Sequence, residues 1–398
     1  MPKSSFRSLC FCFLLCLLPV FTGCADTSET SAPVPTLPAA TEAPSQGAST
    51  PLPTPSPSLT PTPSPSPSPT PSPTPSPKEV SITFSFAGDV TLGSDLINQN
   101  TARNFYTVYD RVQDDAYFFA NVLPIFEDDD ITLVNLEGVL SDRGERRDKT
   151  FAFRGPSSYV NILLKGSVEA VSLGNNHSSD YGDISYEDTV AILDEAGILH
   201  ARDADVCYTT VKDTKIAMIS IYELRLGEEA TKKMLDSAIA EAKSEGALLI
   251  IASFHWGTEG SNKVIKTQTE LAHYAIDLGA NIVIGHHPHR LQGIEKYNGA
   301  YIVYSLANFC FGGNTNPADK DTMIFRQTFT LIDDVLQPDD NIQVIPCSVS
   351  SVETPNNYQP TPKTGEEGER IIGRINEFSR EFGLQLEASS DGIYVPKQ

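Results

Sequence analysis

Residues 79–93 read EVSITFSFAGDVTLG, and this stretch decides where the folded region starts. Its apolar side chains alternate with polar or small ones, at Val80, Ile82, Phe84 and Phe86. Alternation with a period of two predicts a β-strand, which here ends at Gly88-Asp89. Up to Pro77 the chain is instead a repeat of proline, serine and threonine. We therefore place the start of the first domain at residue 79.

The same arrangement, a short apolar run with polar residues at its end, recurs five times along the chain. The runs are DDDITLVNLEG, VEAVSLGNNHSSDYG, GALLIIASFHWGTEG, GANIVIGHHPH and GAYIVYSLANFCFGG. Between them, ISYEDTVAILDEAGI and TQTELAHYAIDLGA show helical spacing of apolar residues and stop at glycine. Alternating strands and helices predict an α/β layered fold, in which active sites lie beyond the carboxyl ends of the strands. The polar residues at those ends include Asp89, Glu137, Asn176, His177, His255, His287, His289 and Asn308.

Carboxylate oxygens and imidazole nitrogens at these strand ends are ligands that suit zinc, manganese or iron. One such residue after one strand is usually part of a turn. A turn needs none of these side chains, however, so their joint occurrence indicates more than connection. The sequence therefore predicts a site for one or two divalent metal ions.

Three of the seven histidines stand together in VIGHHPHRLQGIE, residues 283–295. Surface chance, hydrogen-bonded core histidines and a pH-sensitive loop are the alternatives to a metal site. Pro288 disfavours helical geometry at His287, and in an extended chain alternate side chains point the same way. We therefore expect His287 and His289 to converge on one centre. His286 should face the other side, where it would support the site from behind.

The composition limits the partners. The chain has 398 residues, of which 40% are hydrophobic, and a formal net charge of −22 at pH 7. This charge argues against nonspecific binding to nucleic acid or to anionic lipid. It would also repel an anionic substrate, unless a local group of cations or a bound metal reverses the field.

The segment SDRGERRDKTFAFRG, residues 141–155, gathers positive charge soon after Glu137. Guanidinium groups bind carboxylates through paired hydrogen bonds, so one interpretation is a clamp for an anionic substrate. The other is a solvated loop with local salt bridges to Asp142, Glu145 and Asp148. Glu259 in HWGTEG is also open to two interpretations, as a residue that orients a ligand histidine or as part of a polar loop. The cations of the segment are Arg143, Arg146, Arg147, Lys149 and Arg154.

The N-terminus has the pattern of an export signal. Basic residues precede the apolar run LCFCFLLCLLPVF, which is too short to span a bilayer. The following FTGC resembles a bacterial lipoprotein processing site, although Phe21 replaces the usual aliphatic residue, so cleavage without lipidation stays open. We predict a lipoprotein signal peptide over residues 1–24, a lipid on Cys24, and a disordered linker over residues 25–78. The domain would then be anchored at the extracytoplasmic face of a bacterial membrane and extend into the cell wall.

The cysteines fit this interpretation. Cys10, Cys12 and Cys16 lie in the segment to be removed. Cys207, Cys310 and Cys347 remain and show no metal-ligand spacing. We expect buried free thiols, with at most one disulfide.

Six motifs in order carry a resemblance to a known family. FAGDVTLG, VNLEGVLS, LGNNHSSDYG, FHWGTEG, VIGHHPHRLQGIE and YSLANF resemble the bacterial CapA family, named for poly-γ-glutamate capsule synthesis. That family is related in fold to calcineurin-like metallophosphoesterases. The resemblance implies a four-layer α-β-β-α sandwich over residues 79–350. Residues 351–398 would be a C-terminal extension, with one helix at ERIIGRINEFSREFG that packs on the domain.

The resemblance also implies roles for single residues. Glu137 stands where the superfamily usually has a bridging aspartate, and His177 would protonate the leaving group. One departure is that Thr91 occupies the position of a usual histidine ligand, so the site is expected to hold one metal, or a second one loosely. The other implied ligands are Asp89 and His289 for the first metal, and Asn176, His255 and His287 for the second.

Two functions of different kinds follow. The first is a surface-anchored, metal-dependent hydrolase that acts in synthesis, anchoring or processing of an anionic capsule polymer such as poly-γ-glutamate. The alternative is a non-catalytic, polymer-binding subunit of a capsule synthesis and export complex in the membrane. The pair Asn176-His177 favours the first, because a binding protein needs no proton donor. Thr91 favours the second, because it stands where the superfamily usually has a histidine ligand.

Overall fold

The computed structural model describes residues 76–98, 101–338, 341–389 and 393–397. The predicted signal peptide, the four N-terminal cysteines and nearly all of the predicted linker therefore lie outside the described residues. Within the described part, no helix is both long and apolar enough to cross a membrane.

The larger of two main sheets is built around the predicted first strand, β1 (Glu79–Thr91). The main order of the sheet is β18-β19-β16-β14-β1-β2-β5-β6, and β13, β15 and β17 pair beside β1, β14 and β16. Strand β1 pairs with β2 in parallel and with β14 in antiparallel fashion. The other bounds are β2 (Ile131–Leu136), β5 (Ala170–Ser172), β6 (Leu199–Ala201), β13 (Asn308–Phe311), β14 (Asp321–Ile332), β15 (Val335–Leu336), β16 (Ile342–Ser348), β17 (Thr361–Pro362), β18 (Leu386–Ala388) and β19 (Tyr394–Pro396).

The second sheet has six strands in the order β11-β12-β10-β9-β8-β7, and a small third sheet pairs β3 with β4. Strands β8, β9, β10 and β12 are parallel neighbours, which places their carboxyl ends at one edge. The bounds are β7 (Cys207–Val211), β8 (Thr214–Tyr222), β9 (Leu249–His255), β10 (Ile282–His286), β11 (Ile294–Tyr297), β12 (Ala300–Val303), β3 (Val139–Leu140) and β4 (Arg154–Gly155).

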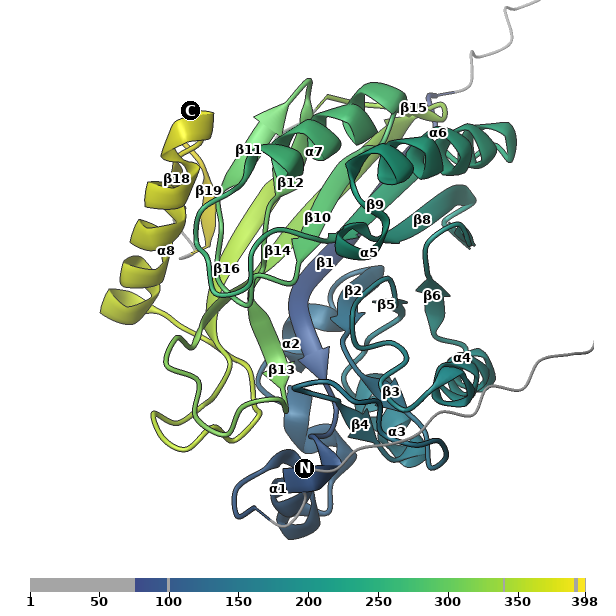
Figure 1. The fold of residues 1–398 in the computed structure, drawn as a ribbon. Coiled ribbons are helices and arrows are strands. Elements are labelled where there is room, and N and C mark those ends of the chain that lie inside the picture. Colours follow the sequence, from purple (N-terminus) through teal and green to yellow (C-terminus); the bar gives the residue numbers. More distant parts are fainter. Residues whose placement is uncertain (1–75, 99–100, 339–340, 390–392, 398) are drawn as a thin grey trace, which may run out of the picture. The chain divides into compact units, whose positions relative to one another are not determined.

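Helices cover the outer faces of both main sheets (Figure 1). Helices α1 (Phe105–Val112), α2 (Leu123–Phe126), α3 (Val160–Lys165) and α4 (Asp183–Ala196) lie on the side of the larger sheet. The six-stranded sheet has α5 (Glu223–Leu226), α6 (Glu228–Ser244) and α7 (Lys266–Leu278). Helix α8 (Gly365–Ser379) runs beside β16 and β11. Short 3-10 turns are η1 (Leu96–Asn98), η2 (Asp115–Phe119), η3 (Ser157–Tyr159) and η4 (Arg380–Phe382).

The order of the four layers follows from the alternation of side chains along each strand. In β9, Ile251 joins a central core with Phe84 of β1, whereas its neighbour Ile250 packs with Leu235 of α6. Val134 of β2 packs outward, in a third core with the helices of the larger sheet. Three apolar cores between four layers confirm the predicted α-β-β-α sandwich. Because each fully buried large apolar side chain contributes about 1.5–3 kcal/mol, these cores are the main source of stability.

One boundary differs from that expected. The apolar run that was expected to end at Asn308 is two strands, since β12 ends at Val303 and Asn308 begins β13. The segment after residue 350 contains the expected helix, which packs on the domain, and it also adds strands to the larger sheet. Its strands β17 and β19 pair with β16, and Ile371 and Ile375 of α8 belong to the central core.

A close approach of two segments positions the first predicted ligand. A Cβ atom on Gly88 would lie 1.9 Å from the main-chain oxygen of Ala307, so only glycine fits there. This approach lets the main-chain N–H of Asp89 donate to the same oxygen at 2.9 Å. The register of β1 shifts between Phe86 and Asp89, which turns the end of the strand out of the regular ladder.

Candidate metal centre

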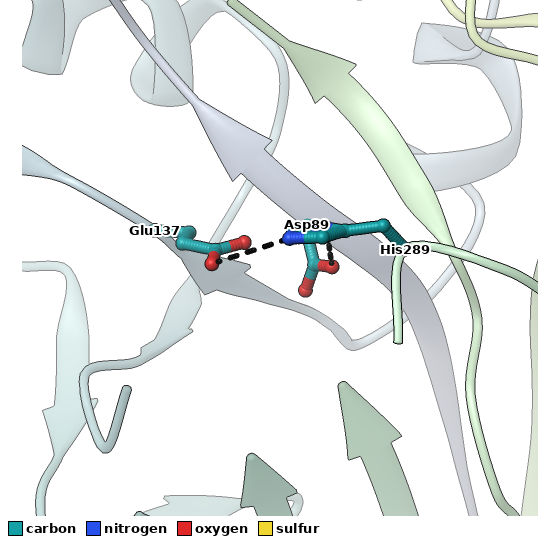
Figure 2. A group of neighbouring side chains, drawn as sticks. All are labelled: Asp89, Glu137 and His289. Atoms are coloured by element: carbon teal, nitrogen blue, oxygen red, sulfur yellow. Dashed lines mark ion pairs between the residues drawn. The ribbon is translucent and has the colours of Figure 1, made fainter. Parts of the chain in front are cut away.

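Asp89, Glu137 and His289 come together at the carboxyl ends of β1, β2 and β10 (Figure 2). Their ligand atoms all lie within 4.8 Å of one another. His289 Nδ1 is 3.0 Å from Asp89 Oδ2, and His289 Nε2 is 3.8 Å from Glu137 Oε1. Both carboxylates are fully buried. Two acids and an imidazole in this arrangement can hold a metal ion.

A chain of amides fixes the Asp89 carboxylate. Asn135 Nδ2 donates to Asp89 Oδ1 at 2.8 Å, and Asn175 Nδ2 donates to Asn135 Oδ1 at 3.0 Å. His286 Nδ1 lies 3.4 Å from the same Asp89 oxygen. Asp89 Oδ2 accepts no hydrogen bond among the described residues, and it is the oxygen nearest to His289. One oxygen of Asp89 is therefore held by amides, and the other is left for a ligand.

A second group of ligand atoms gathers around His255. Its Nε2 atom is 2.8 Å from Asn176 Oδ1, 3.1 Å from His287 Nδ1 and 3.8 Å from Glu137 Oε1. Glu137 is thus near both groups, as a carboxylate shared between two ions would be. The register of the sheet explains part of this placement, because His255 and His286 are paired at the ends of β9 and β10.

Glu137 provides the test of whether the residues fit a divalent ion. Both of its carboxylate oxygens are buried and have no hydrogen-bond partner among the described residues. Its Oε1 atom lies 3.8 Å from the Nε2 atoms of His177, His255 and His289. This distance is too long for a hydrogen bond. It suits atoms that share an ion, because nitrogen and oxygen ligands lie about 2.0–2.2 Å from zinc. A buried carboxylate without a partner is costly, so the donor set fits a metal.

The electrostatics of the cluster depend on burial and on the two acids. Burial raises the pKa of Glu137 well above its usual range, and the Asp89 charge adds to this. Burial also favours the acid form of Asp89, but contacts with His286 and His289 outweigh it and hold the pKa of Asp89 well below its usual range. Burial would lower the pKa of His289, yet attraction to Glu137 and Asp89 raises it to about 9. Without a metal, His289 is therefore the cation that balances the carboxylates.

The imidazoles of His255 and His287 are neutral at pH 7. Burial, followed by repulsion from His289, lowers the pKa of His287 to about 4. Burial also lowers the pKa of His255 well below its usual value, and His287 adds to the shift. Neutral imidazole is the form that binds metals. His255 and His287 are thus already in the protonation state that a ligand needs.

A cavity of about 490 Å³ opens beside these residues. Its polar wall includes Asn176, His177, His289 and Asn308, which lie at or beside the ligand groups. Two cations and one acid also line it, namely Lys149, Arg290 and Glu259. An apolar wall is formed by Phe151, Phe153, Phe311, Pro317 and Ala318.

The model of a protein family described as bacterial capsule synthesis protein PGA_cap matches residues 83–313, more than half of the chain. The chain belongs to the PGA_cap family. The match includes every strand end discussed above, from Asp89 to Asn308. It therefore confirms the resemblance that the six motifs carry.

Named relatives are similar over the same region. The chain is 28% identical over 255 residues to the capsule biosynthesis protein CapA of Bacillus anthracis, which covers 58% of this chain and 60% of that protein. It is 28% identical over 251 residues to the PGA biosynthesis protein CapA of Bacillus subtilis, or 58% of this chain and 63% of that protein. The chain thus matches about three fifths of the length of these relatives.

A probable polyglutamine synthesis accessory protein of Mycobacterium tuberculosis is 25% identical over 299 residues, which covers 66% of this chain and 76% of that protein. Among solved structures, TT1561 of Thermus thermophilus aligns with a TM-score of 0.37 and 11% identity. The alignment covers 62% of this chain and 94% of that chain. At this similarity it supports no argument about the site.

The three histidines of the segment GHHPH, residues 285–289, do not have the expected geometry. His287 and His289 have φ angles of 95° and 54°, so neither is extended, and the alternation argument does not apply. They belong to different ligand groups, because His287 contacts His255, whereas His289 contacts the carboxylates of Asp89 and Glu137. His286 does not face away from the site, because it is the last residue of β10 and lies beside Asp89.

The cationic segment after Glu137 does not form a clamp around the cavity. Of its five cations, only Lys149 lines the cavity wall. The others are engaged elsewhere, since Arg143 pairs with Asp188, Arg146 with Asp95 at 2.6 Å, and Arg147 with Asp183 at 2.6 Å, while Arg154 lies over the Tyr181 ring. The alternative interpretation expected salt bridges to Asp142, Glu145 and Asp148. None of the four contacts just described involves these three residues.

Two residues of the site were missed by sequence reasoning. Arg290 follows His289 directly and lines the cavity. Its only acidic contact among the described residues is a long one, 3.8 Å from Nε to Asp319 Oδ2. Asp180 contacts His177, and its position three residues after that histidine was the available signal.

Two remaining expectations are resolved by contacts. Glu259 is exposed and does not orient His255, whose Nδ1 has no hydrogen-bond partner among the described residues. Cys207, Cys310 and Cys347 are free thiols, and two of them are buried.

Proposed function

We propose that the protein is a metal-dependent hydrolase that acts on an anionic capsule polymer such as poly-γ-glutamate. The observation that supports this most is the buried Glu137 carboxylate, with two unpartnered oxygens among three imidazole nitrogens. Family membership supports a place in capsule synthesis. The similarity to named CapA proteins supports poly-γ-glutamate as the polymer.

The proposed roles of the side chains are as follows. Asp89, Glu137 and His289 would hold a first ion, and Asn176, His255 and His287 would hold a second beside Glu137. A divalent ion, whether zinc, manganese or iron, supplies a Lewis acid and lowers the pKa of water. His177 gives a proton to the leaving atom of the polymer. Arg290, at the cavity wall, binds carboxylates of the polymer.

The proposal includes a location. A lipid on Cys24 would anchor the chain at the extracytoplasmic face of a bacterial membrane, and the linker up to residue 78 would hold the domain within the cell wall. A membrane complex for capsule synthesis is the expected partner, and no nucleic acid is involved. Replacement of Cys24 by alanine tests the anchor, since the variant should no longer incorporate labelled fatty acid.

The enzymatic proposal is tested by incubation of the purified protein with poly-γ-glutamate and, separately, with a generic phosphodiester. Zinc, manganese and iron are each added, and polymer length is followed by gel filtration. We expect metal-dependent shortening of poly-γ-glutamate that is lost in Glu137→Gln. Glu259→Gln is the matched control, because it removes an exposed carboxylate of the same cavity. A metal-loaded protein that cleaves neither compound would contradict the proposal.

One observation favours the alternative, a non-catalytic subunit that binds polymer. The Thr91 hydroxyl donates to the main-chain oxygen of Glu137 at 2.7 Å, and no imidazole stands at this position. The first ion therefore lacks a nitrogen ligand that the wider superfamily supplies. Polymer that binds to the metal-loaded protein and is recovered at full length would support this alternative.

A further inference from the structure

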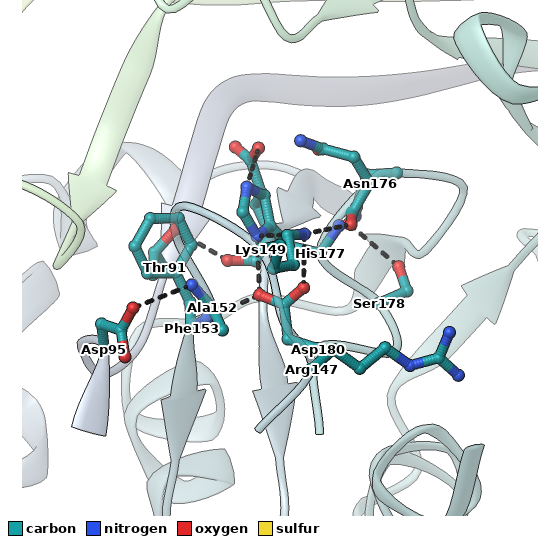
Figure 3. Close-up of polar contacts among 12 residues, drawn as sticks. Thr91, Asp95, Arg147, Lys149, Ala152, Phe153, Asn176, His177, Ser178 and Asp180 are labelled. Atoms are coloured by element: carbon teal, nitrogen blue, oxygen red, sulfur yellow. Dashed lines mark hydrogen bonds and ion pairs between the residues drawn. The ribbon is translucent and has the colours of Figure 1, made fainter. Parts of the chain in front are cut away.

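His177 is held firmly by Asp180 and by the side chains around it (Figure 3). Its Nδ1 atom lies 2.6 Å from Asp180 Oδ2, and the Asp180 side chain is 1% exposed. The same oxygen accepts the main-chain N–H of Phe153 at 2.6 Å. The Phe153 ring also packs against the imidazole, with centroids 4.4 Å apart. The ring of His177 is thus fixed by a carboxylate at its edge and by an aromatic ring at its face.

Lys149 completes the arrangement. Its Nζ atom donates to Asp180 Oδ1 at 2.7 Å and to the main-chain oxygen of Asn176 at 2.9 Å. Nζ is also 3.3 Å from His177 Nδ1, and an ammonium group can only donate. Nδ1 cannot both accept from Lys149 and donate to Asp180. The contact with Asp180 is 0.7 Å shorter (3.3 against 2.6 Å) and joins a donor to a charged acceptor, so it decides the position of the hydrogen.

We propose that Asp180 is a positioning residue, which keeps a hydrogen on Nδ1 of His177 and makes Nε2 the atom that faces the reaction. Nε2 lies on the side of Glu137, 3.8 Å from Oε1. The catalytic consequence rests on the function proposed above. Protonated His177 gives its Nε2 hydrogen to the leaving atom and keeps its Nδ1 hydrogen, and solvent returns a proton to Nε2. Lys149 balances the charge of Asp180 throughout.

The position of the hydrogen can be measured without substrate. In protein with ¹⁵N-labelled histidine at pH 8, neutral His177 should show a protonated Nδ1 and an unprotonated Nε2, with and without zinc. The signal is assigned by its loss in His177→Asn. A wild-type His177 with its hydrogen on Nε2 would overturn the proposal, whatever any variant does.

Asp180→Asn tests the role of the carboxylate. An amide can offer either an oxygen or an N–H group to Nδ1, so the variant should show a mixture of the two tautomers. Asp183→Asn is the control, because Asp183 lies nearby on an exposed site and pairs with Arg147 instead. A pure Nδ1–H tautomer in a folded Asp180→Asn protein would contradict the assignment.

Hydrolysis gives a second measure. Asp180→Asn should lower kcat about 100-fold or more and leave KM and zinc affinity within about threefold of wild type. A purely structural role would change zinc affinity and the unfolding temperature instead. If wild type cleaves no polymer, the proposed function fails, but the tautomer measurement still decides the role of Asp180.

Discussion

At the scale of single residues, the imidazoles of the centre differ in what they contact, and this sets what their removal should do. His287 and His289 each face a different ligand group, whereas His286 supports one oxygen of Asp89. A ligand contributes directly to metal affinity. A residue that only orients a ligand typically contributes less, about 10- to 100-fold.

We expect His287→Ala and His289→Ala each to abolish tight binding of zinc, measured by titration calorimetry after removal of metal with a chelator. His286→Ala should bind zinc with affinity reduced by about tenfold. His273→Ala is the control, because His273 packs on Tyr297 and contacts Glu295, away from the centre. Tight binding that survives both substitutions at His287 and His289 would rule out the ligand set.

A half-buried carboxylate outside the centre, that of Asp129, makes stability depend on pH. Burial raises the pKa of Asp129 from 3.8 to about 6, while a hydrogen bond from Thr132 opposes the shift. The folded state therefore holds the proton more tightly than the unfolded state does. Stability is lost as the pH rises from about 4 to about 6, and the full cost remains above pH 6.

Asp129→Asn should therefore stabilise the protein at pH 7.5 by on the order of 1 kcal/mol, since solvent screens part of the charge. The gain should disappear near pH 4, where wild-type Asp129 is protonated as well. Urea unfolding at both pH values measures the difference in free energy of unfolding between the variant and wild type. Asp128→Asn, an exposed neighbour, should change little. An equal gain at both pH values would show that charge is not the cause.

At the scale of elements, the turn at the end of β1 depends on the absence of a side chain. Gly88→Ala would bring a Cβ atom within 1.9 Å of the Ala307 oxygen, so the two segments must separate. We expect a destabilisation of about 3 kcal/mol or more, with weaker metal binding because Asp89 moves. Gly373 in α8 has no neighbour within 4 Å, and Gly373→Ala should stabilise by about 0.5–1 kcal/mol. In thermal unfolding, Gly88→Ala should have a lower unfolding temperature than wild type and Gly373→Ala a higher one.

The elements were largely predictable because their apolar patterns are local. Alternation at Ile82, Phe84 and Phe86 sufficed for β1, and glycine marked the ends of α4 and α7. The break between β12 and β13 was missed, since the apolar run continues across it. The ion pairs of Arg146 and Arg143 were missed because their partners lie 51 and 45 positions away. Distant pairing follows from the fold and leaves no local pattern.

At the scale of the whole molecule, the C-terminal segment belongs to the sandwich. Ile371 and Ile375 of α8 fill the central core, and Arg370 and Arg374 pair with Asp321 at the start of β14. The PGA_cap match ends at residue 313, before all of these elements. The folded unit is therefore longer than the region that identifies the family.

Removal of residues 351–398 should prevent stable folding, because it exposes the face of β16 and removes three strands of the larger sheet, β17, β18 and β19. Circular dichroism and limited proteolysis of the shortened chain measure this. Arg374→Gln offers a milder test and should lower the unfolding temperature without loss of metal binding. A shortened chain that unfolds cooperatively and binds zinc like wild type would show that the segment is dispensable.

The ligands of the centre are spread over 200 positions, from residue 89 to residue 289, and lie on both sheets. No half of the chain holds a complete set, so an ion cannot nucleate folding and can only arrive once the sandwich has closed. Under the proposed function, uptake of the metal would then be the last step of maturation. The identity of the bound ion would be decided by the metals present where folding finishes.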